Sequence, residues 1–132
     1  MADPLKRVSS GSPFETTIGF SRAVRVGEHI LVSGTAPVEA DGSSTPGDAE
    51  VQAARCFAII LAAVEELGGT AADVVRTRMF LVDAADAEAV GRAHGAAFGE
   101  VRPAATMVVV SALLRPEWRV EIEAEAVLGG GG

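Results

Sequence analysis

Apolar and polar residues alternate without interruption near the end of the chain. The stretch VEIEAEAV (120–127) places Glu121, Glu123 and Glu125 at every second position, with valine, isoleucine or alanine between them. Successive side chains of a β-strand point to opposite faces of the sheet, so this pattern predicts a strand with one acidic and one apolar face. Like charges on one face of a strand destabilise it unless opposite charges or a special environment compensate them.

Two segments show the spacing of three and four residues that is typical of a helix buried on one side. The first runs from about Asp48, a suitable N-cap, to Gly68-Gly69, a suitable C-terminal stop. Its predicted inner face consists of Phe57, Ile60, Leu61, Val64 and Leu67. The second helix is predicted over 86–100, with an inner side made of Val90, Ala93, Ala97 and His94.

Several shorter segments are rich in β-branched residues and predict strands. RAVRVGEHILVSG (22–34) predicts a hairpin that turns at Gly27-Glu28, and the Pro-, Gly- and Ser-containing segment 35–48 predicts a loop. ATMVVVSAL (105–113) follows Pro103 as another strand, and LKRVSS (5–10) is a candidate for an additional one. In DVVRTRMFLVD (73–83), alternation assigns Val75, Thr77, Met79 and Leu81 to one face and Val74, Arg76, Arg78 and Phe80 to the other.

The predicted order is therefore strand-strand-helix-strand-helix-strand-strand. This order predicts an α+β fold in which both helices cover one face of a mixed sheet. The apolar residues of 120–127 then face the helices, and the glutamates face the opposite side. If the strand at 73–83 lies near the last one, Arg76 and Arg78 can pair with two of the three glutamates, each pair contributing roughly 0.2–1 kcal/mol.

The open face is also predicted to carry Phe80, Met107 and Val109. A one-layer sheet with large apolar residues on its open side usually has a partner, and closure of several copies around a symmetry axis would cover it. A glutamate enclosed between copies would have a raised pKa and could exchange a proton near neutrality. One of the three glutamates is therefore a candidate functional group, and the other two are expected to be structural.

Composition narrows the class of protein further. A chain of 132 residues with 48% hydrophobic residues predicts one domain over 1–132, with flexible ends at 1–10 and 128–132. Neither a signal peptide nor a bilayer-spanning apolar run is visible, which predicts a cytoplasmic protein without membrane contact. The formal net charge of −7, with Lys6 the single lysine, disfavours nucleic acid as a partner. One cysteine (Cys56, predicted to be core) and two histidines disfavour a metal site.

GFSRAVRVGEHILVSG, VVRTRMFLVD, RPAATMVVV and VEIEAEAV occur in this order and together resemble the RidA/YjgF family. The resemblance extends from about Gly11 to Val127. It implies a chorismate-mutase-like fold whose sheets close into a barrel in a homotrimer, with three clefts between subunits. It also implies hydrolysis of imines or enamines to a 2-keto acid and ammonia, without a cofactor. Some relatives carry an endoribonuclease label instead.

The resemblance also implies roles for individual residues. Glu121 matches the glutamate that positions the attacking water. Ser33 and Gly34 match a segment that lines the cleft, and Met107 matches a strand position whose backbone contacts the substrate. Phe20 or Ser21 occupies the position of a cleft-lining tyrosine.

The chain departs from the family pattern at the carboxylate-binding arginine, which is Ala105 here, and at a polar helix residue, which is Gly91. Loss of a charged hydrogen-bond partner costs about 1.5–3 kcal/mol, so activity on simple 2-imino acids is predicted to be weak or absent. Arg22 or Arg102 could supply another cation, although a loop arginine such as Arg102 is more often solvated. His94 could contact a ligand, although a packed histidine is the commoner case.

Three functions remain open at this stage. The first is a RidA-like hydrolase of an imine, enamine or related carbonyl metabolite. The second is a non-catalytic trimer that binds a keto- or imino-acid-like metabolite, with a regulatory role. The third, an endoribonuclease, is disfavoured by the acidic charge because phosphate contacts supply most nucleic-acid affinity.

Overall fold

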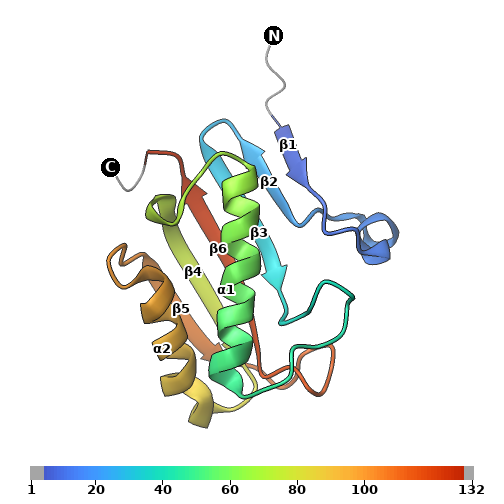
Figure 1. The fold of residues 1–132 in the computed structure, drawn as a ribbon, viewed down its shortest axis with the longest axis vertical. Helices are drawn as coiled ribbons and strands as arrows, with labels where there is room; N and C mark the ends of the chain where they lie inside the picture. Colours follow the sequence, from blue (N-terminus) through green and yellow to red (C-terminus); the bar gives the residue numbers. More distant parts are fainter. Residues whose placement is uncertain (1–4, 130–132) are drawn as a thin grey trace.

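A six-stranded sheet with two long helices on one of its faces makes up the fold (Figure 1). The structure is a computed structural model that describes residues 5–129. Its strands lie side by side in the order β1-β2-β3-β6-β4-β5; β4 and β5 are parallel and all other neighbours are antiparallel. The predicted α+β fold with a mixed sheet is therefore confirmed. The strands are β1 Leu5–Val8, β2 Ala23–Val26, β3 His29–Thr35, β4 Val74–Leu81, β5 Ala104–Val109 and β6 Val120–Val127.

Both predicted helices form, α1 over Ala49–Glu66 and α2 over Ala87–Phe98. The Asp48 carboxylate caps α1 by accepting the N–H of Val51 at 3.0 Å, which satisfies one of the unpaired donors of the first turn. At the other end Gly68 adopts φ 98°, a left-handed conformation that glycine reaches without the steric cost of a Cβ. These local signals explain why α1 begins and ends where it does.

The core lies between the helices and the sheet. The apolar residues of β6 point into it: Val120 and Ile122 are completely buried, and Ala124 and Ala126 are nearly so. Phe57, Ile60 and Val64 of α1 pack from the other side. Burying one large aliphatic side chain contributes about 1.5–3 kcal/mol, which fixes the register of β6 and directs its glutamates to the face without helices. This orientation was predicted from the alternation.

The predicted faces of β4 are correct from Thr77 onward and wrong before it. Thr77, Met79 and Leu81 are buried against the helices, but Val74 is buried and Val75 is 37% exposed. The pairing of β4 with β6 shifts its register between Val74 and Arg76. This irregularity reverses the alternation at the beginning of the strand, so Val75 does not share the face of Thr77.

Two predictions for the strand after Pro103 are also corrected. β5 ends at Val109 and not at 113, because its partner β4 ends at Leu81, which pairs with Val109. Met107 pairs with Met79 and packs against the core, whereas Val108 pairs with Phe80. Paired residues share a face, so Val108 lies on the open face and Met107 and Val109 do not, contrary to the prediction.

The additional strand considered at 5–10 is formed as β1, which pairs with β2 at the edge of the sheet. Of the ends expected to be flexible, residues 1–4 and 130–132 lie outside the described residues.

Between β1 and β2 the chain makes a projection with a short π-helical turn, Glu15–Gly19 (Figure 1). The Glu15 carboxylate accepts hydrogen bonds from Ser9 and Ser10, which keep the pKa of Glu15 below its ordinary value despite burial. None of the helices in residues 5–129 has the length and apolar character that a membrane crossing requires.

Candidate functional site

Two of the three glutamates of β6 form ion pairs. Arg78 Nη1 donates to Glu123 Oε1 at 3.2 Å and to Glu125 Oε2 at 3.0 Å, which confirms the predicted pairing across the strands. Arg76 was expected to pair in the same way, but its Nη2 instead lies 3.5 Å from Thr106 Oγ1 on β5. Within residues 5–129, Glu121 makes no hydrogen bond or ion pair.

Glu121 lies in a recess that depends on Gly34 of β3. A Cβ added at Gly34 would come 3.4 Å from Glu121 Cδ and well inside van der Waals contact of Oε2. The glycine is therefore the reason why the carboxylate can lie against this strand. β3 carries a bulge here: Val32 pairs with Ala124 and Thr35 with Ile122, so two residues of β3 stand opposite one of β6. Bulges often occur beside active sites, where they redirect a side chain.

The recess shifts the proton affinity of Glu121. Burial raises the pKa of Glu121 above its ordinary value, the positive charge of Arg22 opposes this rise, and the negative charge of Glu123 adds to it. A half-buried carboxyl group with a raised pKa can hold or transfer a proton closer to neutrality than an exposed one.

Arg22 fixes the bulge from the side of β2. Its Nη2 donates to Ser33 O and to Gly34 O, both at 2.7 Å, and the Ser33 hydroxyl donates to Ser21 O at 2.7 Å. Phe20, which is 38% exposed, directly precedes Ser21 and Arg22 in the chain. We call Phe20, Ser33, Gly34 and Glu121 the glutamate half-site. Arg22 was a candidate for a ligand-binding cation on sequence grounds. In the structure its guanidinium is hydrogen-bonded to the backbone of the bulge.

The other candidate residues gather on β5 and α2. Ala105 is exposed and pairs with Thr77, whose hydroxyl lies 2.8 Å from His94 Nε2. The His94 ring also packs against Phe57 and Phe98, with centroids 5.6 and 5.2 Å apart, and burial lowers the pKa of His94. We call Ala105, Met107 and His94 the alanine half-site. Arg102 is exposed in the turn before β5, with φ 56°, and Gly91 is exposed on α2.

One chain does not bring the two half-sites together. Glu121 stands opposite Phe80 on the face without helices, whereas Ala105 pairs with Thr77, which faces the helices. Strand β4 also lies between β6 and β5. Within residues 5–129 the predicted site residues therefore form two separate groups, on opposite faces of the sheet.

Sequence reasoning missed one residue that positions the site. Gln52 of α1 is buried, and its amide donates to Thr45 O at 3.2 Å and to Glu117 O at 3.0 Å, while its Oε1 accepts the N–H of Arg119 at 2.8 Å. Gln52 thereby ties the beginning of β6 to α1, two residues before Glu121. The signal was present in the sequence, because Gln52 stands four residues before Cys56 on the apolar face of the helix.

These observations define an α+β protein with a half-buried, unpaired carboxylate beside a β-bulge. In residues 5–129 no group of three or more His, Cys, Asp or Glu side chains could hold a metal ion. The family described as Endoribonuclease L-PSP matches residues 11–128. The chain belongs to this family, which is the RidA/YjgF family that the sequence motifs resemble.

Individual relatives agree with this assignment. An uncharacterized protein of Streptomyces coelicolor is 38% identical over 97% of this chain and 96% of its own length. The 2-iminobutanoate/2-iminopropanoate deaminase of Escherichia coli is 32% identical over 82% of this chain and 86% of its own. The crystal structure of a YjgF-family member from Mycobacterium tuberculosis is 41% identical, with a TM-score of 0.86, and covers 94% of this chain and 99% of the other.

Proposed function

We propose that this chain is a cytoplasmic, single-domain protein that forms a homotrimer of chorismate-mutase-like fold, in which the sheets of three copies close into a barrel. The glutamate half-site of one copy then meets the alanine half-site of the next. The separation of the two half-sites in one chain supports this arrangement, since a second copy can complete the site. The open face of the sheet supports it too, because Leu31 and Val108, 43% and 42% exposed, and Phe80 lie there beside the charges.

The completed cleft is proposed to hold a small imine, enamine or related carbonyl metabolite. Glu121 accepts a proton from a water molecule, and the water oxygen attacks the carbon of the C=N bond. That proton passes to the nitrogen and gives a carbinolamine. The hydroxyl proton of the carbinolamine then moves through Glu121 to the nitrogen, the C–N bond breaks as the C=O bond forms, and a carbonyl compound and ammonia leave. The reaction needs no cofactor, and neither a membrane nor a nucleic acid takes part. The single observation that carries this proposal is the half-buried Glu121 carboxylate, unpaired and with a raised pKa, against Gly34.

Ala105 limits the substrates that such a site can use. An alanine offers no charge to the carboxylate of a 2-imino acid. Loss of a charged hydrogen bond costs about 1.5–3 kcal/mol, or one to two decades in affinity. The natural substrate is therefore proposed to be a carbonyl-derived metabolite without this carboxylate.

Hydrolysis of 2-iminopropanoate, generated in the cuvette by an amino-acid oxidase, tests the proposal. We expect little acceleration by the native protein, a gain of at least tenfold for Ala105→Arg, and loss of that gain when Glu121→Gln is added. Gly95→Ala on α2 is the matched control, since its methyl group would meet open space. A native rate equal to that of Ala105→Arg would refute the reading of Ala105, and full activity of the Glu121→Gln double variant would refute the role of the glutamate.

The second candidate function is metabolite binding without turnover. Ala105 and the exposed Gly91 favour this second function. They stand where relatives carry an arginine and a polar helix residue, and a cleft without these two groups keeps its shape but loses catalytic contacts. A thermal-shift titration with 2-ketobutanoate should stabilise the native protein and not Glu121→Ala, with no turnover of any imine. Cleavage of RNA by the native protein, lost in Glu121→Ala, would instead favour the third function.

A further inference from the structure

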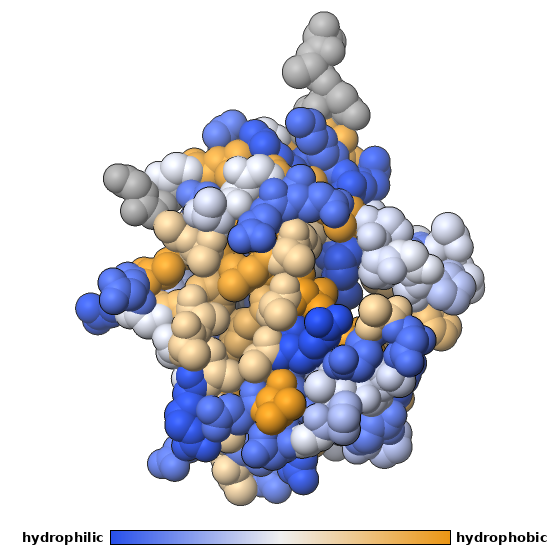
Figure 2. Space-filling model, viewed as in Figure 1, coloured by the Kyte–Doolittle hydropathy of each residue, from blue (hydrophilic) through white to orange (hydrophobic). Residues whose placement is uncertain are grey.

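The sheet is wider than the helices that cover it, which leaves a groove on the helix side. α1 lies over the middle of the sheet, and β1 and β2 extend beyond it (Figure 1). On this face apolar residues gather over α1, with hydrophilic residues around them (Figure 2). Between α1 and β1 lies a cavity of about 240 Å³, which we call the α1–β1 groove. This volume suits a small metabolite and is too small for a drug-sized ligand.

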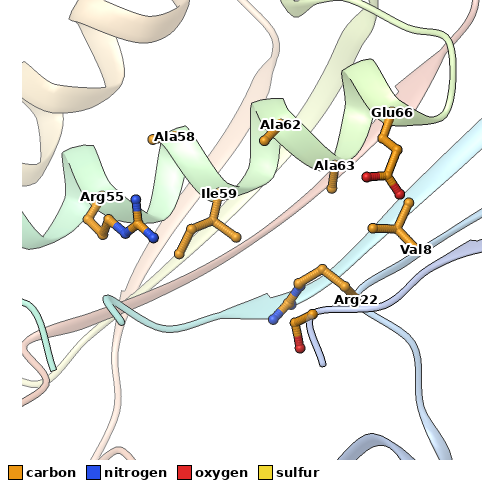
Figure 3. A pocket seen from close by; sticks show the side chains of 9 residues that line it. Val8, Arg22, Arg55, Ala58, Ile59, Ala62, Ala63 and Glu66 are labelled. Carbon is orange, nitrogen blue, oxygen red and sulfur yellow. The ribbon is translucent and has the colours of Figure 1, made fainter. Parts of the chain in front are cut away.

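Charged groups stand at both ends of the groove, and its floor is apolar. Arg55 points from α1 toward the strands, and Arg22 extends beneath α1 toward the end at which Arg55 lies (Figure 3). Glu66 stands at the opposite end (Figure 3). Arg55 and Glu66 are eleven positions apart along α1, or about 16 Å of helix. Ala58 and Ala62 line the wall between them.

Arg22 retains donors that no described residue uses. A guanidinium carries five N–H groups. Nη2 of Arg22 uses its two for Ser33 O and Gly34 O, whereas the Nε of Arg22 is buried without a hydrogen-bond partner. A buried polar group without a partner is uncommon and calls for an explanation. The same guanidinium lines the groove, so its positive charge is available to an anion at this end.

Arg55 offers its outer edge to the same space. Its Nε donates to Val38 O at 2.7 Å, so both terminal nitrogens remain for a bidentate contact with a carboxylate. The Glu39 carboxylate lies 3.8 Å from the same Nε, but both side chains are more than a third exposed, so this pair competes weakly. Within residues 5–129, Glu15 and Glu121 act on Arg22 only through their charges and make no hydrogen bond or ion pair with its guanidinium.

We propose that the α1–β1 groove binds a small monocarboxylate with a short apolar chain, whose carboxylate lies between Arg22 and Arg55. The apolar chain packs along Ala58 and Ala62, which are one helical turn or about 6 Å apart. That length matches a four-carbon acid. Glu66 lies beyond the chain and disfavours the reverse orientation through charge repulsion. The site shares Arg22 with the bulge beside the Glu121 recess but lies on the helix side of the sheet, and it does not depend on the proposed catalysis.

Titration of the isotope-labelled full chain with sodium butanoate, followed by amide NMR, tests this site. We expect saturable shifts at Ala58 and Ala62. Arg55→Gln should weaken binding by about ten- to a hundredfold, the effect of losing one charged hydrogen-bond partner. Ala62→Leu should block the groove sterically while retaining every charge. Arg92→Gln is the control: it removes an arginine of α2 that pairs with Glu50 of α1, and it should bind butanoate as the native chain does.

Butanamide, the uncharged analogue, should produce no saturable shifts. The proposal is overturned if butanamide binds as tightly as butanoate, if Arg55→Gln keeps the native dissociation constant within twofold, or if butanoate causes no saturable shift. Shifts confined to Gly34 and Phe80 would place the ligand at the Glu121 recess and also overturn it. Because none of these readouts uses turnover, failure of the groove and failure of the proposed hydrolysis remain distinguishable.

Discussion

Replacement of Gly34 by alanine should displace the Glu121 carboxylate and leave the fold intact. The backbone of Gly34 does not require positive φ, so alanine meets no conformational barrier. Its Cβ would, however, lie 3.4 Å from Glu121 Cδ and much closer to Oε2. Comfortable contact needs about 3.5 Å, so the carboxylate must retreat by about 1 Å.

The expected energies are small and partly cancel. Displacement of Glu121 from its preferred rotamer costs about 0.5–1.5 kcal/mol. Reduced entropy of the unfolded chain returns about 0.4–1 kcal/mol for a glycine-to-alanine change at a compatible site. The free energy of unfolding should therefore change by less than about 1 kcal/mol. The position of the carboxylate, by contrast, should change enough to affect its proton affinity.

Two measurements on Gly34→Ala separate these effects. Urea denaturation should give nearly the native free energy of unfolding, and an NMR titration should show the pKa of Glu121 falling back toward its ordinary value of 4.5 as the group regains water. Gly95→Ala, whose methyl group meets open space within α2, should stabilise the fold by about 0.5–1 kcal/mol and leave Glu121 unchanged. An unchanged pKa of Glu121 in Gly34→Ala would refute the account of the recess.

Three further predictions concern neighbouring groups. Because burial raises the pKa of Glu121, the protonated form favours folding: this contribution is complete below about pH 4.5 and is lost as the pH rises through the higher pKa of the folded state. Glu121→Gln should therefore raise Tm near pH 7 and have no effect below about pH 4, and an effect of equal size at both pH values would contradict this. Burial, aided by the charge of Glu121, raises the pKa of the Cys56 thiol to about 12, so iodoacetamide should label Cys56 in urea but not in the native protein near pH 8. Rapid native labelling would show that α1 opens readily. Arg78→Ala should destabilise the fold by about 0.5–2 kcal/mol at low salt and less in 1 M NaCl, whereas an effect independent of salt would indicate packing instead of ion pairs.

The elements with strong periodicity could be predicted from the sequence. The spacing of Phe57, Ile60 and Val64 located α1, and the alternation of β6 gave both its faces and its acidic side, because in each case one face is fully buried and the pattern must follow it. The pairing of Arg78 with Glu123 and Glu125 followed from the same alternation.

The faces of β5 and the first residues of β4 could not be predicted in this way. β5 lies at the edge of the sheet, and its last three residues belong to an apolar run (107–110) in which no polar residue marks the alternation. The irregularity near Val75 leaves no sign in the sequence, since a bulge depends on how two strands pair and not on either strand alone.

The candidate site was predictable only as a set of residues. Resemblance to the family indicated Glu121, Gly34 and Ala105, but nothing in the order of residues showed that the first two contact each other while the third lies on the opposite face. The role of Arg22 as a ligand of the bulge carbonyls also required three-dimensional structure, because its partners lie eleven and twelve residues away along the chain.

The central claim is that a second copy of the chain completes the site that one copy holds only in part. Light scattering coupled to size-exclusion chromatography tests it most directly. We predict a particle with three times the 13.5 kDa mass of the chain at micromolar concentration. A monomer under these conditions would contradict the claim, because the glutamate and alanine half-sites would then remain on opposite faces of one sheet.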